Sequence, residues 1–323
     1  MSARVVLLIL LAAVAPGCGG ATGTREGPPT SPSAPAGGPT LQPAATVRLS
    51  GAAASGLAEA GGWLWVTHFE ASVLSQVDPR TAAEAGTLEV GANGASVTTV
   101  GSRLWIAHYT NRPGDAMVTA VEPRAAVVVG RVPLPHLCCE VAGAAGLLWA
   151  VDPRGTLLAI DPGPVRVVAS TPVSLDVNVH VGLVGDERGL WLSSDTTPLL
   201  RVDPSIARVV ASLDVGGGIP MALAHGLVWG AGPRHVWAVD PETNAVRVRL
   251  PLENTIEVLN LAVSDDALWV GARRPGSVGV VLRYDLASQR LTGEAAVGLP
   301  ARLIFAFGSV WVVDWDANRL LRF

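Results

Sequence analysis

Seven Leu-Trp or Val-Trp pairs recur along the chain at nearly constant spacing, and this repeat restricts the possible folds more than any other feature. Successive tryptophans of the set lie 40, 44, 42, 38, 40 and 42 residues apart. A period of about 40 to 45 residues, filled with short apolar segments, is typical of the blades of a β-propeller. The tryptophans are Trp65, Trp105, Trp149, Trp191, Trp229, Trp269 and Trp311.

A second motif follows most of these tryptophans by about a dozen residues and reads apolar, acidic, proline. It first occurs as Val77-Asp78-Pro79, and in the sixth unit it weakens to Tyr284-Asp285-Leu286. Asp-Pro suits a type I turn, because the carboxylate accepts from the backbone and proline presets φ. Short segments rich in Val and Leu lie on either side of the motif. Each unit therefore predicts four antiparallel strands, termed a to d, with the tryptophan on strand b and the acid-Pro turn between c and d.

The two ends of the repeating region complement each other. The seventh unit stops at Phe323, before its strand d, whereas residues 46–50 resemble the d strands elsewhere. Pairing this N-terminal segment with the last unit closes the ring and leaves only short, protected edges. Residues 46–323 are therefore predicted to be all-β: a seven-bladed β-propeller of four-stranded antiparallel blades, closed by an N-terminal strand that completes the last blade. Strands buried on both faces by neighbouring blades account for a chain that is 49% hydrophobic.

The N-terminus has the pattern of an export signal. Residues 5–15 form an apolar run behind Arg4, which is too short to cross a bilayer as a helix of roughly 20 residues. The run ends in Ala15-Pro16-Gly17-Cys18, which resembles the lipobox of bacterial lipoproteins. We expect residues 1–18 to be a lipoprotein-type signal with Cys18 lipidated, and residues 19–45, rich in Gly, Pro, Ser and Thr, to be a disordered tether. The protein is then exported and held by its lipid to the outer side of the cytoplasmic membrane or to an outer membrane.

The blade motifs resemble a group of bacterial propellers. Gly-x-Leu-Trp-Val, then Val-Asp-Pro, then a Val-rich strand is similar to the streptogramin (virginiamycin) B lyase-like, YVTN and NHL repeats. The resemblance implies a propeller, and in its lyase members an elimination reaction that uses His, Glu and Mg²⁺ on one face. Those lyases commonly have Glu three residues after the strand-b tryptophan. None of the equivalent positions is Glu in this chain; they are His68, His108, Asp152, Ser194, Gly232, Ala272 and Asp314.

These positions nevertheless suggest a functional sector. Four consecutive blades of the predicted ring present a titratable group there: Asp314, His68, His108 and Asp152. The connections between strands d and a lie on the same face as the b–c turns, and they add further polar or sulfur-containing side chains. These are His136, Cys138, Cys139 and Glu140 before the third blade, and Asp176, Asn178 and His180 before the fourth, with Asp195 in the b–c turn of the fourth.

Two interpretations of this sector remain open. His68, His108, Asp152, Asp314, His136, His180 and Asp195 are candidates for ligand binding, and the first three for holding a divalent metal such as Zn, Cu or Mg. Alternatively, polar side chains at the ends of b strands cap turns and line the channel. Cys138 and Cys139 are candidates for redox or metal chemistry, or else form a structural vicinal disulfide or packed thiols.

Composition excludes several functions. All 23 basic residues are Arg, which excludes lysine Schiff bases and a P-loop lysine. With 27 acidic residues there is no basic footprint for nucleic acid. We find no nucleophile-elbow or zinc-protease motif. We therefore expect a monomeric binding or scaffold module for a protein, peptide or envelope glycan rather than an enzyme. The alternatives are a metal-dependent lyase or hydrolase, and metal or redox sensing through Cys138-Cys139.

Overall fold

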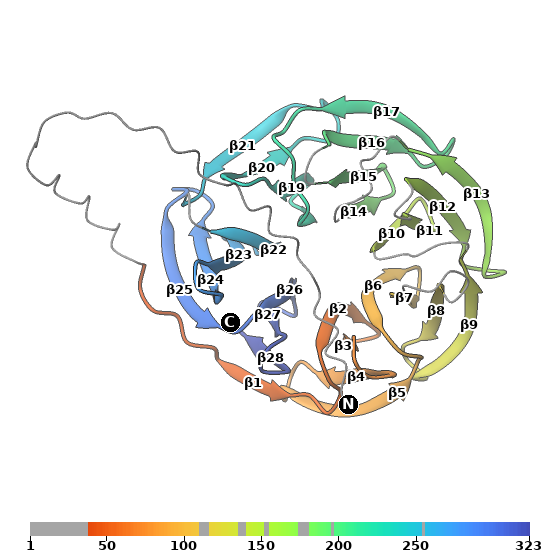
Figure 1. The fold of residues 1–323 in the computed structure, drawn as a ribbon, viewed down its shortest axis with the longest axis horizontal. Helices are drawn as coiled ribbons and strands as arrows, with labels where there is room; N and C mark the ends of the chain where they lie inside the picture. Colours follow the sequence, from red (N-terminus) through yellow and green to blue (C-terminus); the bar gives the residue numbers. More distant parts are fainter. Residues whose placement is uncertain are drawn as a thin grey trace, which may run out of the picture. The chain divides into compact units, whose positions relative to one another are not determined.

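The computed structural model describes residues 38–109, 116–134, 140–151, 155–173, 181–194, 197–253 and 256–323. These residues form seven four-stranded antiparallel sheets arranged as the blades of a ring (Figure 1). The chain is thus a seven-bladed β-propeller, as the repeat predicts. No helix in the described part is both long and apolar enough to span a membrane.

Within each blade the four strands lie side by side, with strand a nearest the centre of the ring and strand d at its outer edge (Figure 1). In blades one to seven, strand a is β2 (Ala54–Ala60), β6 (Gly94–Val100), β10 (Glu140–Ala144), β14 (Val181–Asp186), β18 (Met221–Ala224), β22 (Glu257–Val263) and β26 (Pro300–Ala306). Strand b is β3 (Trp63–His68), β7 (Arg103–His108), β11 (Leu147–Val151), β15 (Gly189–Ser194), β19 (Leu227–Ala231), β23 (Ala267–Arg274) and β27 (Ser309–Asp314). Strand c is β4 (Val73–Asp78), β8 (Met117–Glu122), β12 (Thr156–Asp161), β16 (Leu199–Asp203), β20 (His235–Val239), β24 (Val278–Asp285) and β28 (Arg319–Arg322). Strand d is β5 (Ala83–Glu89), β9 (Val127–Pro133), β13 (Arg166–Pro172), β17 (Arg208–Leu213), β21 (Val246–Pro251), β25 (Leu291–Val297) and β1 (Ala45–Arg48).

The ring closes through the N-terminal strand, as predicted. β1 pairs antiparallel with β28, with Ala45 opposite Arg322 and Arg48 opposite Arg319. The residues just before β1 also pair with the neighbouring blade. The amide of Leu41 donates to the Glu294 carbonyl at 2.6 Å, and the amide of Glu294 donates to the Pro39 carbonyl at 2.9 Å. The segment 39–41 therefore lies along the outer edge of β25, so the N-terminal segment joins blade six as well as blade seven.

The tryptophan repeat has a specific structural reason. All seven tryptophans lie on strand b and are at most 7% exposed. Four of them donate an indole N–H to the carbonyl five residues earlier, at the end of strand a, over 3.0 to 3.2 Å: Trp65 to Ala60, Trp149 to Ala144, Trp229 to Ala224 and Trp311 to Ala306. Phenylalanine is smaller and has no N–H, so it cannot make this bond, which favours tryptophan at these four positions.

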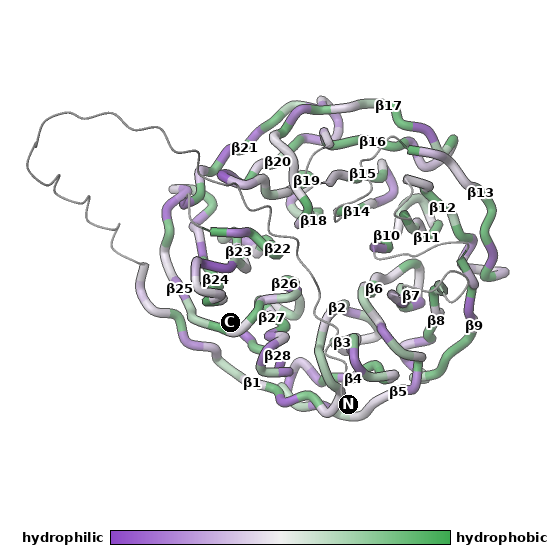
Figure 2. Tube along the Cα trace, viewed as in Figure 1, coloured by the Kyte–Doolittle hydropathy of each residue, from purple (hydrophilic) through white to green (hydrophobic). Residues whose placement is uncertain are grey.

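The apolar residues are buried between neighbouring blades. One core cluster, for example, joins Trp65 and Leu74 of blade one to Leu104 and Val121 of blade two. Apolar and polar residues alternate around the whole ring rather than gathering on one side (Figure 2). Contacts between blades thus account for the hydrophobic composition.

The acid-Pro turns form as the motif predicts. The carboxylate accepts from the amide two residues later at 2.9 Å in the turns of Asp78, Asp161, Asp203 and Asp240. These bonds favour the charged carboxylate. The pKa of Asp240 falls to about 2, chiefly through its side-chain hydrogen bond with Arg247.

Candidate functional site

The two faces of the ring differ in how much their connections vary. The a–b connections contain two residues in six blades and three, residues 264–266, in blade six. The d–a connections range from two residues, 298–299, to eight, 173–180, and the b–c connections from three to eight. Uniform turns serve the fold, whereas variable connections on a rigid scaffold are where binding sites usually arise. We call the face formed by the b–c and d–a connections the variable face.

Three of the seven candidate ligand residues are described, and all three are buried at the end of strand b. Glu140 of the predicted sector is described as well and begins β10. His68, His108 and Asp314 are 0%, 3% and 0% exposed. Their side chains contact their own blade instead of opening toward solvent. The other predicted residues lie outside the described part of the chain: Cys18, His136, Cys138, Cys139, Asp152, His180 and Asp195.

His108 uses both of its ring nitrogens within blade two. Nδ1 donates to the Ala92 carbonyl at 2.8 Å, so in the neutral ring Nε2 accepts from the Thr119 hydroxyl, also at 2.8 Å. This tautomer is assigned from the partners, since the carbonyl can only accept. Burial lowers the pKa of His108 below its ordinary value, which keeps the ring neutral at neutral pH. The imidazole ties the d–a connection to strand c.

His68 has a similar place in blade one. Its Nε2 lies 2.8 Å from the Ser75 hydroxyl on strand c, and Gly51 packs directly on the ring, since a Cβ there would come within 2.5 Å of it. Nδ1 lies near the Ala52 carbonyl without a hydrogen bond of normal geometry. Burial, as the main cause, lowers the pKa of His68.

Asp314 is paired inside blade seven. Its carboxylate accepts from the Gly298 amide at 3.2 Å and from Arg319 Nε at 2.9 Å. Asp314 and His108 would therefore have to exchange protein partners to bind a metal. In the described ranges, no three His, Cys, Asp or Glu side chains are grouped so that they could hold a metal ion.

An aromatic side chain that is not among the candidate site residues directly follows each of these three residues. Trp315, Phe69 and Tyr109 follow Asp314, His68 and His108 directly, in three consecutive blades, and all three are half-buried. The ring centroids of Phe69 lie 5.8 Å from Trp315 and 5.6 Å from Tyr109, with tilted planes. We call these three residues the aromatic row. The signal was present in the sequence as an aromatic residue four positions after the strand-b tryptophan.

The backbone places the aromatic row in the same way in each blade. The amides of Phe69, Tyr109 and Trp315 donate to the carbonyls of Ala53, Asn93 and Leu299, at 2.8, 2.8 and 2.9 Å. Each acceptor immediately precedes strand a of its blade. The row is thus fixed to the innermost strands by three equivalent bonds, and the buried side chains beneath it hold the same turns.

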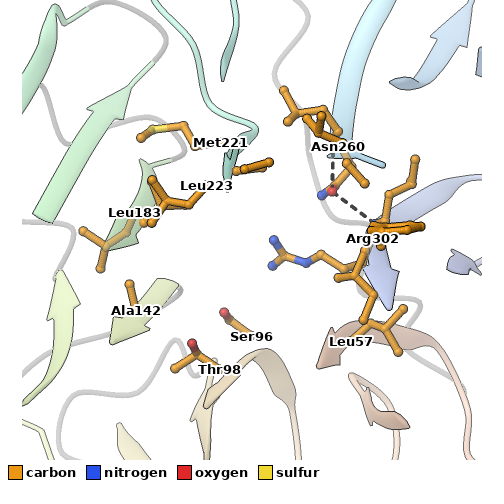
Figure 3. A pocket seen from close by; sticks show the side chains of 18 of the residues that line it. Leu57, Ser96, Thr98, Ala142, Leu183, Met221, Leu223, Asn260 and Arg302 are labelled. Atoms are coloured by element: carbon orange, nitrogen blue, oxygen red, sulfur yellow. Dashed lines mark hydrogen bonds between the residues drawn. The ribbon is translucent and has the colours of Figure 1, made fainter. Parts of the chain in front are cut away.

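A cavity of about 520 Å³ lies at the centre of the ring, lined by the a strands. Leu57, Leu183, Met221 and Leu223 contribute apolar wall, and Arg302 extends from β26 toward the centre (Figure 3). Arg302 Nη2 lies 3.3 Å from Glu140 Oε1, which joins blade seven to blade three across the channel. Ser96 of blade two donates to Glu140 Oε2 at 3.1 Å. Because Glu140 begins strand a, this polar group lies toward the variable face.

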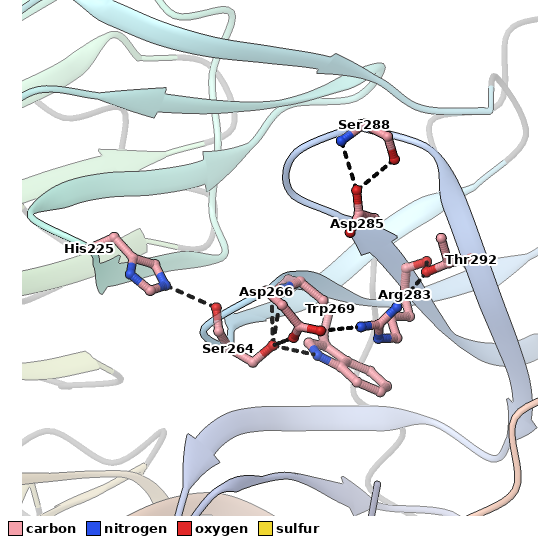
Figure 4. Close-up of polar contacts among 9 residues, drawn as sticks. His225, Ser264, Asp266, Trp269, Arg283, Asp285, Ser288 and Thr292 are labelled. Atoms are coloured by element: carbon pink, nitrogen blue, oxygen red, sulfur yellow. Dashed lines mark hydrogen bonds and ion pairs between the residues drawn. The ribbon is translucent and has the colours of Figure 1, made fainter.

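The opposite face carries a polar cluster between blades five and six (Figure 4). His225 Nε2 donates to the Ser264 carbonyl at 2.9 Å, while the Ser264 hydroxyl donates to Asp266 at 3.1 Å. Asp266 also pairs with Arg283 at 2.6 Å, and Trp269 donates to the Ser264 hydroxyl. The imidazole contacts the backbone and not the hydroxyl, so the hydroxyl–imidazole–carboxylate order of a hydrolase is not formed. The cluster fixes an a–b turn.

Comparison with known proteins supports the fold alone. No protein-family model matches the chain, and no curated protein is similar to it in sequence. Among solved structures, a chain of the Kuenenia stuttgartiensis hydrazine synthase superposes with a TM-score of 0.67 at 13% identity, covering 85% of this chain and 96% of that one. A chain from a crystal structure of the mitotic checkpoint complex superposes with a TM-score of 0.68 at 12% identity, covering 94% and 98%. At such low identity these likenesses say nothing of activity.

The arrangement on the variable face is suited to binding. The aromatic row offers π surfaces held rigidly by backbone bonds, and the nearby titratable groups are occupied within the protein. Aromatic side chains supply large contact area at little cost in conformational entropy. The face therefore has the parts of a binding surface, while the hydroxyl–imidazole pairs beneath it, Ser75–His68 and Thr119–His108, are buried away from solvent.

Proposed function

We propose that this protein is an exported, membrane-tethered binding module that holds a protein, peptide or envelope glycan against its variable face. The observation that carries the proposal is the aromatic row. Trp315, Phe69 and Tyr109 remain half-buried and in contact on the face whose connections vary most. Aromatic residues dominate the energetics of protein interfaces, and their faces also stack on other flat or apolar groups.

The comparison with the mitotic checkpoint complex supports this proposal by analogy. As its title states, that structure is a complex, so a ring of this shape serves there within an assembly. This is likeness of fold only. The proposal includes membership of the streptogramin B lyase-like, YVTN or NHL repeat group, on the strength of the blade motifs.

Attachment to a membrane is the second part of the proposal. It rests on the signal-like residues 1–18, on Cys18, and on the Gly- and Pro-rich residues 19–37 that precede the described ring. Cys18→Ser should move the protein from the membrane fraction to the soluble extracytoplasmic fraction of the producing cells. A variant that stays in the membrane fraction would show that Cys18 is not the anchor.

The binding face is tested by photo-crosslinking in the producing cells. Benzoylphenylalanine at position 69 should trap a discrete species, and Trp315→Ala in the same chain should abolish the adduct. Phe307 provides the matched control, because it is an aromatic residue 43% exposed in an a–b turn of the opposite face. The same adduct from position 307, or none from position 69, would contradict binding at the variable face.

A metal-dependent lyase or hydrolase is the alternative function. It is favoured by one observation, the buried Nδ1 of His68, which has no hydrogen-bond partner of normal geometry among the described residues. His68, His108 and Asp152 would be the ligands of Zn, Cu or Mg. Elemental analysis of protein purified without a His tag decides the matter: bound metal that is lost in His68→Ala supports the alternative, and metal-free wild-type protein that Zn and Cu do not stabilise refutes it.

A further inference from the structure

The charge around the aromatic row restricts what the row can bind. On the variable face of blades seven, one and two, the described connections contain two charged residues, Glu70 and Asp316. Both are acidic and exposed, and neither carboxylate has a hydrogen bond or an ion pair among the described residues. Glu70 directly follows Phe69, and Asp316 directly follows Trp315. Because consecutive Cα atoms are about 3.8 Å apart, both carboxylates lie within about a Debye length of the rings they follow.

The other charges around the row balance each other. The outer strands β1, β5 and β9 carry two arginines and two glutamates, namely Arg48, Arg131, Glu84 and Glu89. Two ion pairs near the variable face are neutral as well, Arg319 with Asp314 and Arg302 with Glu140. Residues 110–115 lie outside the described part of the chain, and by sequence they contain one arginine and one aspartate. The unbalanced charge next to the row is therefore that of the two exposed carboxylates, which favours a positively charged ligand.

The rings themselves are suited to a cation. A guanidinium or an ammonium group is attracted to the face of an aromatic ring within about 6 Å of its centroid, and most strongly to tryptophan. Along the row the centroids of Trp315, Phe69 and Tyr109 are 5.8 and 5.6 Å apart. A cation about 4 Å above the junction of two neighbouring rings therefore lies within about 6 Å of both centroids. The row has two such junctions.

We propose that the aromatic row binds an extended segment of a partner protein that carries arginine or lysine side chains. This inference rests on the proposed function and names the chemistry of the partner at the same surface. In an extended chain, residues i and i+2 point to the same side and lie about 6.6 to 7 Å apart. This distance is close to the spacing of the rings, so two cationic side chains of one segment reach the two junctions. Glu70 and Asp316 attract the cations, whereas a neutral glycan gains nothing from these carboxylates.

A peptide with the sequence Gly-Ser-Arg-Ser-Arg-Ser-Gly, blocked at both ends, is the probe. Its match replaces both arginines by citrulline, which has a similar shape without the charge. Both peptides are titrated at low ionic strength into the purified wild-type protein by isothermal calorimetry. We expect the arginine peptide to bind with a dissociation constant of about 1 mM or tighter, and the citrulline peptide at least about fivefold more weakly. Trp315→Ala should weaken binding of the arginine peptide at least about fivefold.

The carboxylates are tested by Glu70→Gln combined with Asp316→Asn, which leaves the three rings in place. This double variant should weaken binding of the arginine peptide at least about threefold and leave binding of the citrulline peptide unchanged. The matched control is Glu187→Gln combined with Asp265→Asn, which removes two exposed carboxylates from a–b turns of the opposite face. The control has the same net charge as the first double variant and should bind both peptides as the wild type does.

Several results would overturn the inference. Equal affinity for the two peptides would do so, as would equal losses in the two double variants, since the latter indicates a non-specific attraction to an acidic protein. Binding of chitotriose, a neutral glycan, in place of the arginine peptide, with loss of binding in Trp315→Ala, would assign the row to glycans and overturn it as well. If Trp315→Ala does not fold by circular dichroism, the double variants and the two peptides decide the question.

The proposed function has a separate readout. Benzoylphenylalanine at position 69 forms its adduct with a partner of any charge. An adduct at position 69 without a preference for arginine over citrulline overturns this inference alone, whereas the lack of any adduct there overturns the proposed function.

Discussion

The contribution of the indole hydrogen bond on strand b to the stability of the protein can be measured by comparing two tryptophans in adjacent blades. Trp65 and Trp105 occupy the same position and are both 0% exposed. Trp65 donates to the Ala60 carbonyl at 3.0 Å, whereas Nε1 of Trp105 has no acceptor among the described residues. Substitution by phenylalanine removes the same atoms at both sites. The cavity cost, on the order of 2 kcal/mol, is therefore common to both variants.

The difference between the two variants isolates the hydrogen bond. Trp65→Phe also loses a bond worth about 1 kcal/mol, while Trp105→Phe removes a buried unsatisfied donor that costs about 1 to 3 kcal/mol. We expect Trp65→Phe to lower the free energy of unfolding by about 2 to 4 kcal/mol more than Trp105→Phe does. Urea unfolding followed by far-ultraviolet circular dichroism measures this, provided the slope m is unchanged. Trp311→Phe, which also loses such a bond, should behave like Trp65→Phe. Equal losses at positions 65 and 105 would refute the explanation of the tryptophan repeat.

Three further predictions concern the ring. Burial depresses the pKa of His108 below its ordinary 6.5, so the unfolded chain takes up the proton first as the pH falls. The stability should be full above about pH 6.5 and decrease as the pH drops through the folded-state pKa. In a series of urea midpoints measured at different pH values, His108→Gln should reduce this decrease. Gly293→Leu should displace Leu41 from β25, because a Cβ there comes within 2.6 Å of that side chain. Thermolysin, which cleaves before apolar residues, should then cut at Leu41 faster. Gly86→Leu on blade one is the control, since its Cβ meets nothing within 4 Å, and equal protection in both variants would contradict the pairing. Asn318 donates to the carbonyls of residues 49 and 51 and accepts from the amide of residue 54. Asn318→Gly tolerates the local φ of 47° and should lower the free energy of unfolding in urea by about 2 kcal/mol. An unchanged midpoint would show that these bonds do not hold the ends of the chain together.

The fold could be predicted from the sequence because its determinants are local and repeated. The period of the tryptophans sets the number of blades, and the acid-Pro motif forms the same turn in four of them. The closure of the ring could be predicted because the seventh unit lacks strand d, and the N-terminal segment supplies this strand. Every one of these inferences needs only neighbouring residues or a comparison of one unit with the next.

The candidate site could be predicted only in part, for a geometric reason. The sequence analysis selected the third position after each strand-b tryptophan because titratable side chains occur there, but His68, His108 and Asp314 still belong to strand b and are buried. The first side chain beyond the strand is the fourth, where the aromatic row begins. Nothing in the repeat marks Arg302, since its role depends on Glu140, 162 residues away across the ring.

The position of the aromatic row would link the proposed ligand binding to the closure of the ring. Trp315 belongs to blade seven and Phe69 to blade one, so their contact crosses the seam where the chain ends meet without a covalent bond. Asn318 crosses the same seam, from the turn that carries Trp315 to the segment leading into β2. A ligand that contacts both rings binds only the closed ring, and by mass action it stabilises that state over the open one. The buried polar side chains beneath the row fix the turns of blades seven and one, so under the proposed function they would keep Trp315 and Phe69 in register for a ligand that they do not touch themselves.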